Sequence, residues 1–314
     1  MMELNQQLNI IMNKQINNQP LASIIMNCYN GEAYLKESIE SVLSQTFKNW
    51  ELIFWDNQSK DKSAKIFKSY KDKRLKYYYA SEHTILYKAR NEAIKKSSGE
   101  FLAFLDTDDF WEKDKLELQL ALFEDTEVGV VYGNCFIINQ QLNTKKIYID
   151  KKLPKGYILD NLLKNYCTGL VTLVIRKSFL ENSQSPFDSS FHVMGDFDLM
   201  IRMSTKYKFD CVEKPIASWR VHEKNESILY KTKQIKELKI WYEKMISHPI
   251  VCNNKNFSNV NNMINNLEVV NCILENDLKK ARLQIKKMPF SLKKIKYLIA
   301  LLLPNNFVKK FIQF

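Results

Sequence analysis

Three carboxylates crowd into one turn after a short apolar run, and this turn is the part of the sequence best suited to chemistry. Residues 101–105 read Phe-Leu-Ala-Phe-Leu, and Asp106, Asp108 and Asp109 follow. Carboxylates this close repel one another unless water or a shared cation compensates their charge. Mg²⁺ and Mn²⁺ prefer oxygen ligands and leave positions for substrate phosphates, so the turn predicts a metal–phosphate site. Helix capping is the alternative, but it explains only one of the three aspartates.

The acidic turn lies in a region where predicted strands and helices alternate. The strands are expected at residues 21–27, 51–55, 75–79, 101–105 and 128–132, and the helices at residues 32–45, 61–70, 89–97 and 113–123. This alternation predicts parallel βαβ units with right-handed crossovers. Open sheets of this kind bind ligands beyond the carboxyl ends of their strands, which is where the acidic turn lies.

After Gly133 the regular alternation ends. We expect a hairpin at residues 136–148, a strand at 168–175, a helix at 196–206, an extended segment at 216–222 and long helices at 233–246 and 256–287. The fold class is therefore α/β, a Rossmann-like, mostly parallel sheet flanked by helices and followed by a helical C-terminal region. The predicted divisions are a lead over residues 1–19, an α/β domain over 20–225 and a helical region with a basic tail over 226–314.

Four further features can contribute to one site. They are Asp56 and Asn57 after the second strand, Arg90 in a helix, Asp196 at a later helix start, and Arg220 with His222 at the end of an extended segment. The first pair can hydrogen-bond a nucleoside, and an arginine can pair bidentately with a diphosphate. Taken singly, each has an ordinary structural reading: a surface ion pair, a helix cap or a structural histidine.

In this order and at these spacings, the residues resemble the inverting glycosyltransferases of family 2, which have the GT-A fold. The resemblance extends over residues 21–222. Residues 23–31 (Ser-Ile-Ile-Met-Asn-Cys-Tyr-Asn-Gly) look like the first strand and nucleotide loop of that family, and residues 38–46 are similar to its first helix. Residues 106–109 (Asp-Thr-Asp-Asp) match its DxD motif.

The resemblance implies a role for each matching residue. It implies that Asp196 is the catalytic base, that Asn27, Tyr29, Asn30, Asp56, Asn57, Arg90, Asp106, Thr107 and Arg220 bind the nucleotide sugar, and that Asp108, Asp109 and His222 hold Mn²⁺ or Mg²⁺. The implied enzyme moves a hexosyl or N-acetylhexosaminyl group from a nucleotide-diphosphate sugar, with a UDP-sugar favoured. Its acceptor is a hydroxyl of a glycan or lipid-linked molecule, in bacterial surface polysaccharide or lipopolysaccharide synthesis.

The sequence departs from the family pattern in three places. Asn57 replaces the carboxylate that commonly reads uracil, and an amide can donate as well as accept, so the nucleobase stays open. The usual Glu before the catalytic Asp is Gly195 here. The Gln-x-x-Arg-Trp signature is absent, and no stretch reaches the roughly 18–20 apolar residues that span a bilayer. A processive, membrane-spanning synthase is therefore not expected.

The positive charge is concentrated at the C-terminal end. Ten of the 47 Lys and Arg residues lie in residues 278–314, which contain no acidic residue, so the remaining 37 nearly balance the 35 acidic ones. Apolar clusters at residues 297–303 and at Phe307, Val308, Phe311 and Ile312 accompany this charge. We expect this tail to contact an anionic membrane, at about 1 kcal/mol per basic residue near the surface. A helical hairpin that packs on the catalytic domain or a partner is the alternative.

Cysteine usage and the N-terminal composition predict the compartment. The six cysteines are far apart, which indicates buried small side chains in a reducing compartment, and the polar N-terminus does not read as a signal peptide. We therefore expect a cytoplasmic enzyme, peripheral on the inner face of the plasma membrane.

Two other functions remain open. A non-catalytic GT-A domain with a nucleic-acid- or partner-binding tail would need aromatic residues among the basic ones, and these are few, so no nucleic acid is expected. A nucleotidyltransferase would need a basic phosphate loop, and residues 28–31 contain no Lys or Arg.

Overall fold

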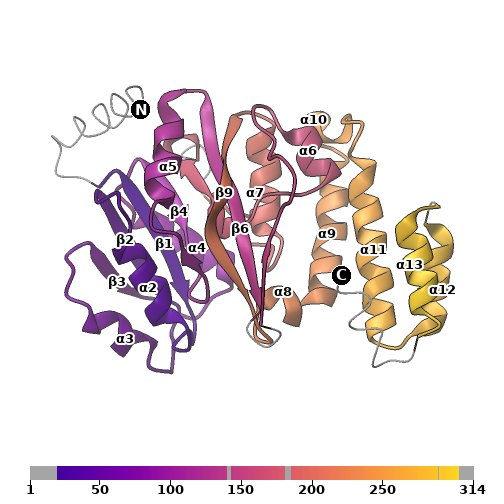
Figure 1. Cartoon of the computed structure of the whole chain (residues 1–314), viewed down its shortest axis with the longest axis horizontal. Helices are drawn as coiled ribbons and strands as arrows, with labels where there is room; N and C mark the ends of the chain where they lie inside the picture. The colour runs from indigo at the N-terminus through magenta and orange to yellow at the C-terminus, as the bar shows by residue number, and fades with distance from the viewer. Residues whose placement is uncertain (1–19, 140–142, 181–184, 289, 304–314) are drawn as a thin grey trace. The chain divides into compact units, whose positions relative to one another are not determined.

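The structure is a computed structural model that describes residues 20–139, 143–180, 185–288 and 290–303 (Figure 1). The chain divides into two compact units, Met1–Glu223 and Lys224–Phe314. The predicted lead over residues 1–19 lies outside the described residues. Within the described part of the chain, no helix combines the length and the apolar character that crossing a bilayer requires.

Four parallel strands form one half of the sheet in the first unit (Figure 1). They are β1 (Ala22–Cys28), β2 (Trp50–Asp56), β3 (Leu75–Tyr79) and β4 (Phe101–Phe104), separated along the chain by α2 (Leu35–Leu43), α3 (Ser63–Ser69) and α4 (Leu86–Lys95). All seven residues of β1 are buried, as expected for a central parallel strand covered on both faces. The predicted strands and helices of this half are present, with ends that differ by a few residues.

The order of these strands creates a switch point between β1 and β4. The chain runs from β1 outward to β2 and β3, and then returns to β4 on the other side of β1. Cys28 is opposite Asp56, and Ile25 is opposite Phe104, so the loops after β1, β2 and β4 leave the same edge of the sheet. Open α/β sheets bind their ligands at such a point.

The second half of the sheet is mixed. Its strands are β5 (Phe110–Trp111), β6 (Val128–Asn139), β7 (Thr144–Ile147), β8 (Val174–Arg176) and β9 (Lys208–Val221). Strand β8 is antiparallel to β4 and β6, β9 is parallel to β6, and β5 and β7 add antiparallel pairs. The predicted strand at 128–132 and the first arm of the predicted hairpin are one continuous strand. The predicted strand at 168–175 begins instead as the 3₁₀ turn η3 (Leu170–Thr172).

Short helices complete the first unit. They are α5 (Lys115–Ala121), η2 (Leu122–Glu124), α6 (Leu159–Lys164), η4 (Lys177–Phe179) and α7 (Gly195–Ser204). Ile39 and Val42 of α2 belong to the same buried core as Ile24 of β1 and Phe54 of β2. This packing fixes α2 against the half of the sheet that carries the switch point.

The second unit is helical. It contains α8 (Glu226–Leu229), α9 (Lys231–Met245), α10 (Pro249–Cys252), α11 (Ser258–Leu274), α12 (Leu278–Lys287) and α13 (Leu292–Ala300). The single helix predicted over residues 256–287 is broken, because Asn276 has a left-handed φ of 61°. Asp277 then caps α12 by accepting the N–H of Lys280 at 3.0 Å. Ala281 and Ile285 of α12 pack with Val269 and Ile273 of α11.

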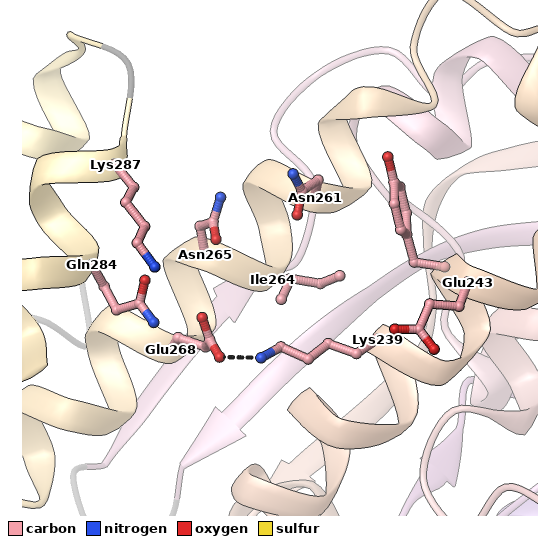
Figure 2. Close-up of a pocket in the computed structure, with 9 residues that line it drawn as sticks. Lys239, Glu243, Asn261, Ile264, Asn265, Glu268, Gln284 and Lys287 are labelled. Carbon is pink, nitrogen blue, oxygen red and sulfur yellow. Dashed lines mark hydrogen bonds and ion pairs between the residues drawn. The ribbon is translucent and has the colours of Figure 1, made fainter. Parts of the chain in front are cut away.

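A polar pocket of about 290 Å³ lies between α9, α11 and α12 in this helical unit (Figure 2). Lys239 of α9 is ion-paired with Glu268 of α11 across it, and Gln284 and Lys287 extend into it from α12.

Glu51 in β2 is a buried charge that joins β1, β2 and the segment before β4. Its side chain is 2% exposed and is ion-paired with Lys76, while Ser23 Oγ and the Ser98 N–H each donate to Oε1 at 2.6 Å. Burial alone would raise the pKa of Glu51, but Lys76 and the serine hydrogen bonds outweigh it and hold the pKa below its ordinary value. A carboxyl with a depressed pKa stabilises the fold above its unfolded pKa, and this stabilisation is lost as the pH falls.

Glu51→Gln should therefore lower the free energy of unfolding by about 1–3 kcal/mol at pH 7, because buried hydrogen bonds to a charged group are lost. The loss should shrink at pH 4, where the carboxyl group of the unfolded chain already takes up protons and the native carboxylate contributes less to stability. Urea denaturation at both pH values measures it. Glu92→Gln is the matched control, because Glu92 is 38% exposed in its pair with Lys95 and should change stability by less than about 0.5 kcal/mol. An equal loss at both pH values would contradict the charge argument.

Candidate active site

The acidic turn between β4 and β5 is held by α2 and by the loop after β1. Ser38 Oγ of α2 lies 2.8 Å from the carbonyl oxygen of Thr107 and 2.6 Å from that of Asp109. These two contacts hold the backbone of the turn against α2. A Cβ on Gly31 would come within 2.7 Å of Thr107 Oγ1. Only glycine therefore lets the loop after β1 approach the turn this closely.

The three aspartates of the turn make different contacts. Asp106 Oδ1 accepts from Arg90 Nη2 at 2.7 Å, and Asp108 Oδ2 lies 2.9 Å from His222 Nε2. Asp109 is 4% exposed, and its Oδ1 accepts the backbone N–H of Arg220 at 2.9 Å. Burial raises the pKa of Asp109 well above its usual range, and Asp108 and Asp106 add to the shift. Burial also raises the pKa of Asp106 against the opposing charge of Arg90.

Arg220 and His222 reach the turn because β5 pairs with β9. The register sets Phe110 opposite Ser218, which brings the end of β9 beside the aspartates. Arg220 is 2% exposed, and its Nε donates to the carbonyl of Asp108 at 2.9 Å. Its guanidinium is ion-paired with Glu37 of α2 and lies 4.5 Å from the centre of the Tyr34 ring. Arg220 therefore braces the backbone of the turn, and its charge is balanced by Glu37.

The acidic turn and the end of β9 bring together two side chains that could hold a metal ion, rather than three. In the ranges that the structure describes, no cluster of three or more His, Cys, Asp or Glu side chains is arranged to hold a metal ion. Asp108 and His222 are adjacent, and their side chains are 28% and 17% exposed. Asp109 is buried, and its carboxylate accepts the backbone N–H of Arg220. In this structure that hydrogen bond links the turn to β9.

One face of α4 joins the acidic turn to the start of α7. Tyr87, Arg90 and Asn91 are three and four residues apart, so they project from the same face of the helix. Arg90 binds Asp106, Asn91 Nδ2 donates to the carbonyl of Phe187 at 2.8 Å, and the Tyr87 hydroxyl lies 3.1 Å from Asp196 Oδ1. Arg90 is 1% exposed, yet its Nε has no hydrogen-bond partner.

Asp196 is the half-buried carboxylate of the first turn of α7. Its Oδ1 accepts the N–H of Phe197 at 2.9 Å. Burial raises the pKa of Asp196 above its ordinary value, while the Phe197 N–H, Arg90 and Tyr87 oppose the shift. Asp198, two residues further along, is fully buried, and its carboxylate accepts a hydrogen bond from Arg202 Nε at 2.8 Å. Asp198 therefore has a structural role in the fold.

The end of β1 and the loop that follows carry three more predicted residues. Asn27 is 7% exposed, and neither atom of its amide has a hydrogen-bond partner. Asn30 has a left-handed φ of 54°, and its Oδ1 accepts the N–H of Lys60 at 2.8 Å. Tyr29 is 51% exposed, and its ring centre lies 4.2 Å from that of His83. An exposed aromatic pair therefore lies at the switch-point edge of the sheet.

Asp56 and Asn57 lie at the predicted edge, but their side chains are engaged within the protein. The carboxylate of Asp56 accepts from the Ser59 N–H and the Tyr77 hydroxyl, each at 2.7 Å. Asn57 Nδ2 donates to the carbonyl of Thr84 at 2.7 Å, and its Oδ1 accepts the Thr84 N–H at 3.2 Å. In this structure the exposed groups beside them are Tyr29 and His83.

Four residues that sequence reasoning missed contribute to this geometry: Glu37, Ser38, His83 and Tyr87. Tyr87 precedes Arg90 by three residues, and Glu37 and Ser38 lie inside the predicted first helix, so the helical positions of these three residues were available as signals. The partners of Glu37, Ser38 and Tyr87 lie between 69 and 183 residues away in the sequence, and His83 lies 26 residues from Asn57, so no local pattern predicts these contacts.

An acidic turn at the switch point, with a carboxylate at the start of a nearby helix, is the arrangement of a GT-A nucleotide-sugar transferase. The model of Glycosyl transferase family 2 matches residues 23–203, and the chain belongs to that family. Its fold is the GT-A fold.

Two curated relatives match about half of this chain. A UDP-Glc:alpha-D-GlcNAc-diphosphoundecaprenol beta-1,3-glucosyltransferase of Escherichia coli, WfgD, is 37% identical over 167 residues, which are 53% of this chain and 64% of the relative. TuaG of Bacillus subtilis, a glycosyltransferase provisionally assigned to teichuronic acid biosynthesis, is 32% identical over 170 residues, 54% of this chain and 67% of the relative. The matched stretches thus span about two thirds of these relatives.

Two solved structures share the fold. TarS 1–349 of S. aureus in complex with UDP-GlcNAc has a TM-score of 0.62 and 16% identity, over 93% of this chain and 88% of that one. The mannosyltransferase PcManGT of Pyrobaculum calidifontis, in complex with GDP-Man and Mn²⁺, has a TM-score of 0.61 and 15% identity, over 94% and 85%. At these identities the likeness concerns the fold alone.

Proposed function

We propose that this protein is an inverting, metal-dependent glycosyltransferase of the hexosyl or N-acetylhexosaminyl class. The observation that carries the proposal is a set of unsatisfied polar groups at the switch point. Both amide atoms of Asn27 and the Nε of Arg90 are buried without partners. A buried polar group without a partner costs about 1–3 kcal/mol, and a bound diphosphate or sugar would supply the missing hydrogen bonds.

Asp196 is the proposed base. Its carboxylate takes the proton of the acceptor hydroxyl as the acceptor oxygen forms a bond to the anomeric carbon. The bond from that carbon to the phosphate oxygen breaks, and its electron pair leaves with the nucleoside diphosphate. One displacement inverts the anomeric configuration. A raised pKa favours this role, because a stronger base takes a proton more readily.

Asp108 and His222 fit as the protein ligands of Mn²⁺ or Mg²⁺, since such ions commonly bind one or two protein groups and complete their shell with substrate phosphates. The bound ion would supply neutralisation of the charge that develops on the leaving diphosphate. Arg90, held by Asp106, would add a fixed positive charge beside it. Thr107 and Arg220 support this site through the backbone of the turn.

Tyr29 and His83 are the proposed platform for the nucleobase. Their rings are exposed and adjacent at the edge where the nucleotide loop begins, and aromatic faces stack on any base. His83 is held there because its Nδ1 lies 2.9 Å from the carbonyl oxygen of Asn57. Asp56, Asn57 and Asn30 shape the loop through their hydrogen bonds within the protein.

A screen of nucleotide sugars by thermal shift, with Mn²⁺ or with a chelator, tests the donor. A donor at about 100 times its Kd should stabilise the fold by about 2.7 kcal/mol. We expect a rise in Tm with one class of nucleotide sugar in Mn²⁺ and none in chelator. No rise with any UDP- or GDP-sugar would contradict the proposal.

A lipid-linked acceptor in surface-polysaccharide synthesis is the proposed second substrate. WfgD is named for a diphosphoundecaprenol acceptor and a UDP-Glc donor, and TuaG for teichuronic acid synthesis. Such an acceptor would require the enzyme to work at the inner face of a membrane.

The helical unit presents apolar surface that suits this contact. Phe290, Leu292 and Leu302 are each more than 80% exposed on and beside α13, among the lysines of residues 278–303. Exposed apolar side chains beside a cluster of positive charge favour an anionic membrane surface. The predicted contribution of Phe307, Val308, Phe311 and Ile312 lies outside the described residues.

Replacing Phe290, Leu292 and Leu302 together with serine should abolish co-sedimentation with anionic vesicles at low salt and leave the fold intact. Removing the whole tail is a poorer test, because Ala281 and Ile285 form part of the core with α11. Ile246→Ser with Ile250→Ser is the control, because both residues are more than 50% exposed in the same unit. Equal pelleting of the triple variant and the wild type would exclude the membrane contact.

A further inference from the structure

The pairing of Gly195 with Tyr87 explains why the residue before the proposed base is a glycine. A Cβ on Gly195 would come within 2.6 Å of ring atoms Cδ2 and Cε2 of Tyr87. A real Cβ atom essentially never comes this close to a neighbouring carbon, so any side chain at position 195 would displace the Tyr87 ring. The glutamate that is usual at this position in the family therefore cannot coexist with Tyr87 as it is placed here.

The ring that occupies this space is fixed on its other sides. Tyr87 is 3% exposed, and its ring stacks on Phe187 with centres 5.3 Å apart. Its hydroxyl lies 3.0 Å from the carbonyl oxygen of Val193 and 3.1 Å from Asp196 Oδ1. Burial raises the pKa of Tyr87 well above its usual range, so the hydroxyl keeps its single proton, which the Val193 carbonyl and Asp196 Oδ1 share as acceptors.

We propose that Tyr87 is a positioning residue for Asp196, and that the absence of a side chain at Gly195 leaves the space that the Tyr87 ring occupies. The inference rests on the proposed role of Asp196 as the base. Oδ1 receives the N–H of Phe197 and the hydroxyl of Tyr87, and Oδ2 is left to take the proton of the acceptor.

Tyr87 also links the base to the phosphate end of the site. Arg90, one turn along α4, lies with its guanidinium 5.4 Å from the Tyr87 ring centre and binds Asp106. The charged and titratable groups around Asp196 are Tyr87 and Arg90 of α4, Asp106 of the acidic turn, and Tyr148 and Tyr166. One helix face therefore sets both the carboxylate that receives the proton and the cation beside the leaving group.

Tyr87→Phe keeps the ring and removes the hydroxyl. The hydrogen bond from Tyr87 lowers the pKa of Asp196, so its loss should raise that pKa and move the acid limb of kcat/KM to higher pH. Turnover should fall about tenfold, because the carboxylate of Asp196 is no longer held in one orientation toward the acceptor, while donor affinity changes little. The assay is release of nucleoside diphosphate from UDP-glucose, UDP-N-acetylglucosamine and GDP-mannose with water as the acceptor.

Tyr166→Phe is the matched control, because Tyr166 is also electrostatically close to Asp196 but makes no hydrogen bond to it. Its acid limb should not move. An unmoved acid limb in Tyr87→Phe, with Asp196→Asn inactive, would overturn the inference and leave the proposed base in place. Turnover retained in Asp196→Asn would instead overturn the proposed base.

The glycine is tested without any donor. Gly195→Ala should lower Tm by about 2–10 °C, because the new methyl group collides with the Tyr87 ring. In a Tyr87→Ala background, the same substitution should leave Tm unchanged or raise it, since alanine is the better helix former once the ring is gone. An equal loss of Tm in both backgrounds would contradict the pairing, whatever the activity assays give.

Discussion

Asp196→Asn should reduce sugar transfer by about 10²–10⁴-fold, the usual contribution of a general base. An amide has nearly the same shape as the carboxylate and can still accept the hydrogen bonds of Phe197 and Tyr87, so the site should stay folded. It cannot take the proton of the acceptor. Donor affinity should remain within about twofold, because in an inverting displacement the base acts on the acceptor.

Turnover and the calorimetric affinity for the donor, measured on the same preparation, separate a loss of proton transfer from a loss of donor binding. In the wild type, activity should fall with decreasing pH at a value above the ordinary aspartate pKa of about 3.9, since burial raises the pKa of Asp196. Asp198→Asn is the comparison, because Asp198 is fully buried against Arg202 and should affect stability rather than proton transfer. Full turnover in Asp196→Asn would move the base to another residue.

Asp108→Asn should weaken Mn²⁺-dependent binding of the nucleoside diphosphate by at least about tenfold. The carboxylate beside His222 is the proposed anionic ligand of the metal, and an amide supplies no charge to hold the cation. Asp109→Asn is the matched control one residue away. Asp109 is buried, and an amide oxygen can still accept the Arg220 N–H, so donor binding should be kept.

Titration of UDP and GDP into each variant, with Mn²⁺ or a chelator, measures the metal-dependent affinity of Asp108→Asn and of Asp109→Asn. If Asp109→Asn lost metal-dependent binding and Asp108→Asn kept it, the assignment of the two aspartates would be reversed. If neither variant changed the affinity, the acidic turn would have no metal role.

The parallel half of the sheet could be predicted because its signals are local. Apolar runs of strand length, separated by amphipathic helices, fix β1 to β4 and place the acidic turn at the edge where ligands bind. The mixed half could not be predicted, because β5 has two residues and β8 has three. Strands this short carry no periodic pattern, and their pairing is decided by the tertiary fold.

The predicted site residues were found by type and order, but a sequence does not say which of their atoms are already engaged. Asp56 and Asn57 lie where a nucleoside site was expected, yet Tyr77 and Thr84 take their hydrogen bonds. Asp196 was identified from its place at a helix start. Its contact with Tyr87 joins residues 109 positions apart and depends on the missing side chain of Gly195.

The stereochemistry of the released sugar distinguishes an inverting transfer from a retaining one. UDP-glucose and GDP-mannose carry the sugar in the α configuration, so a single displacement by water, assisted by Asp196, must release the β anomer first. Proton NMR of the sugar within the first minutes, before mutarotation, distinguishes the two anomers. We expect β-sugar from whichever donor the enzyme accepts in Mn²⁺, and no release by Asp196→Asn. Initial release of the α anomer would contradict a one-step inverting transfer.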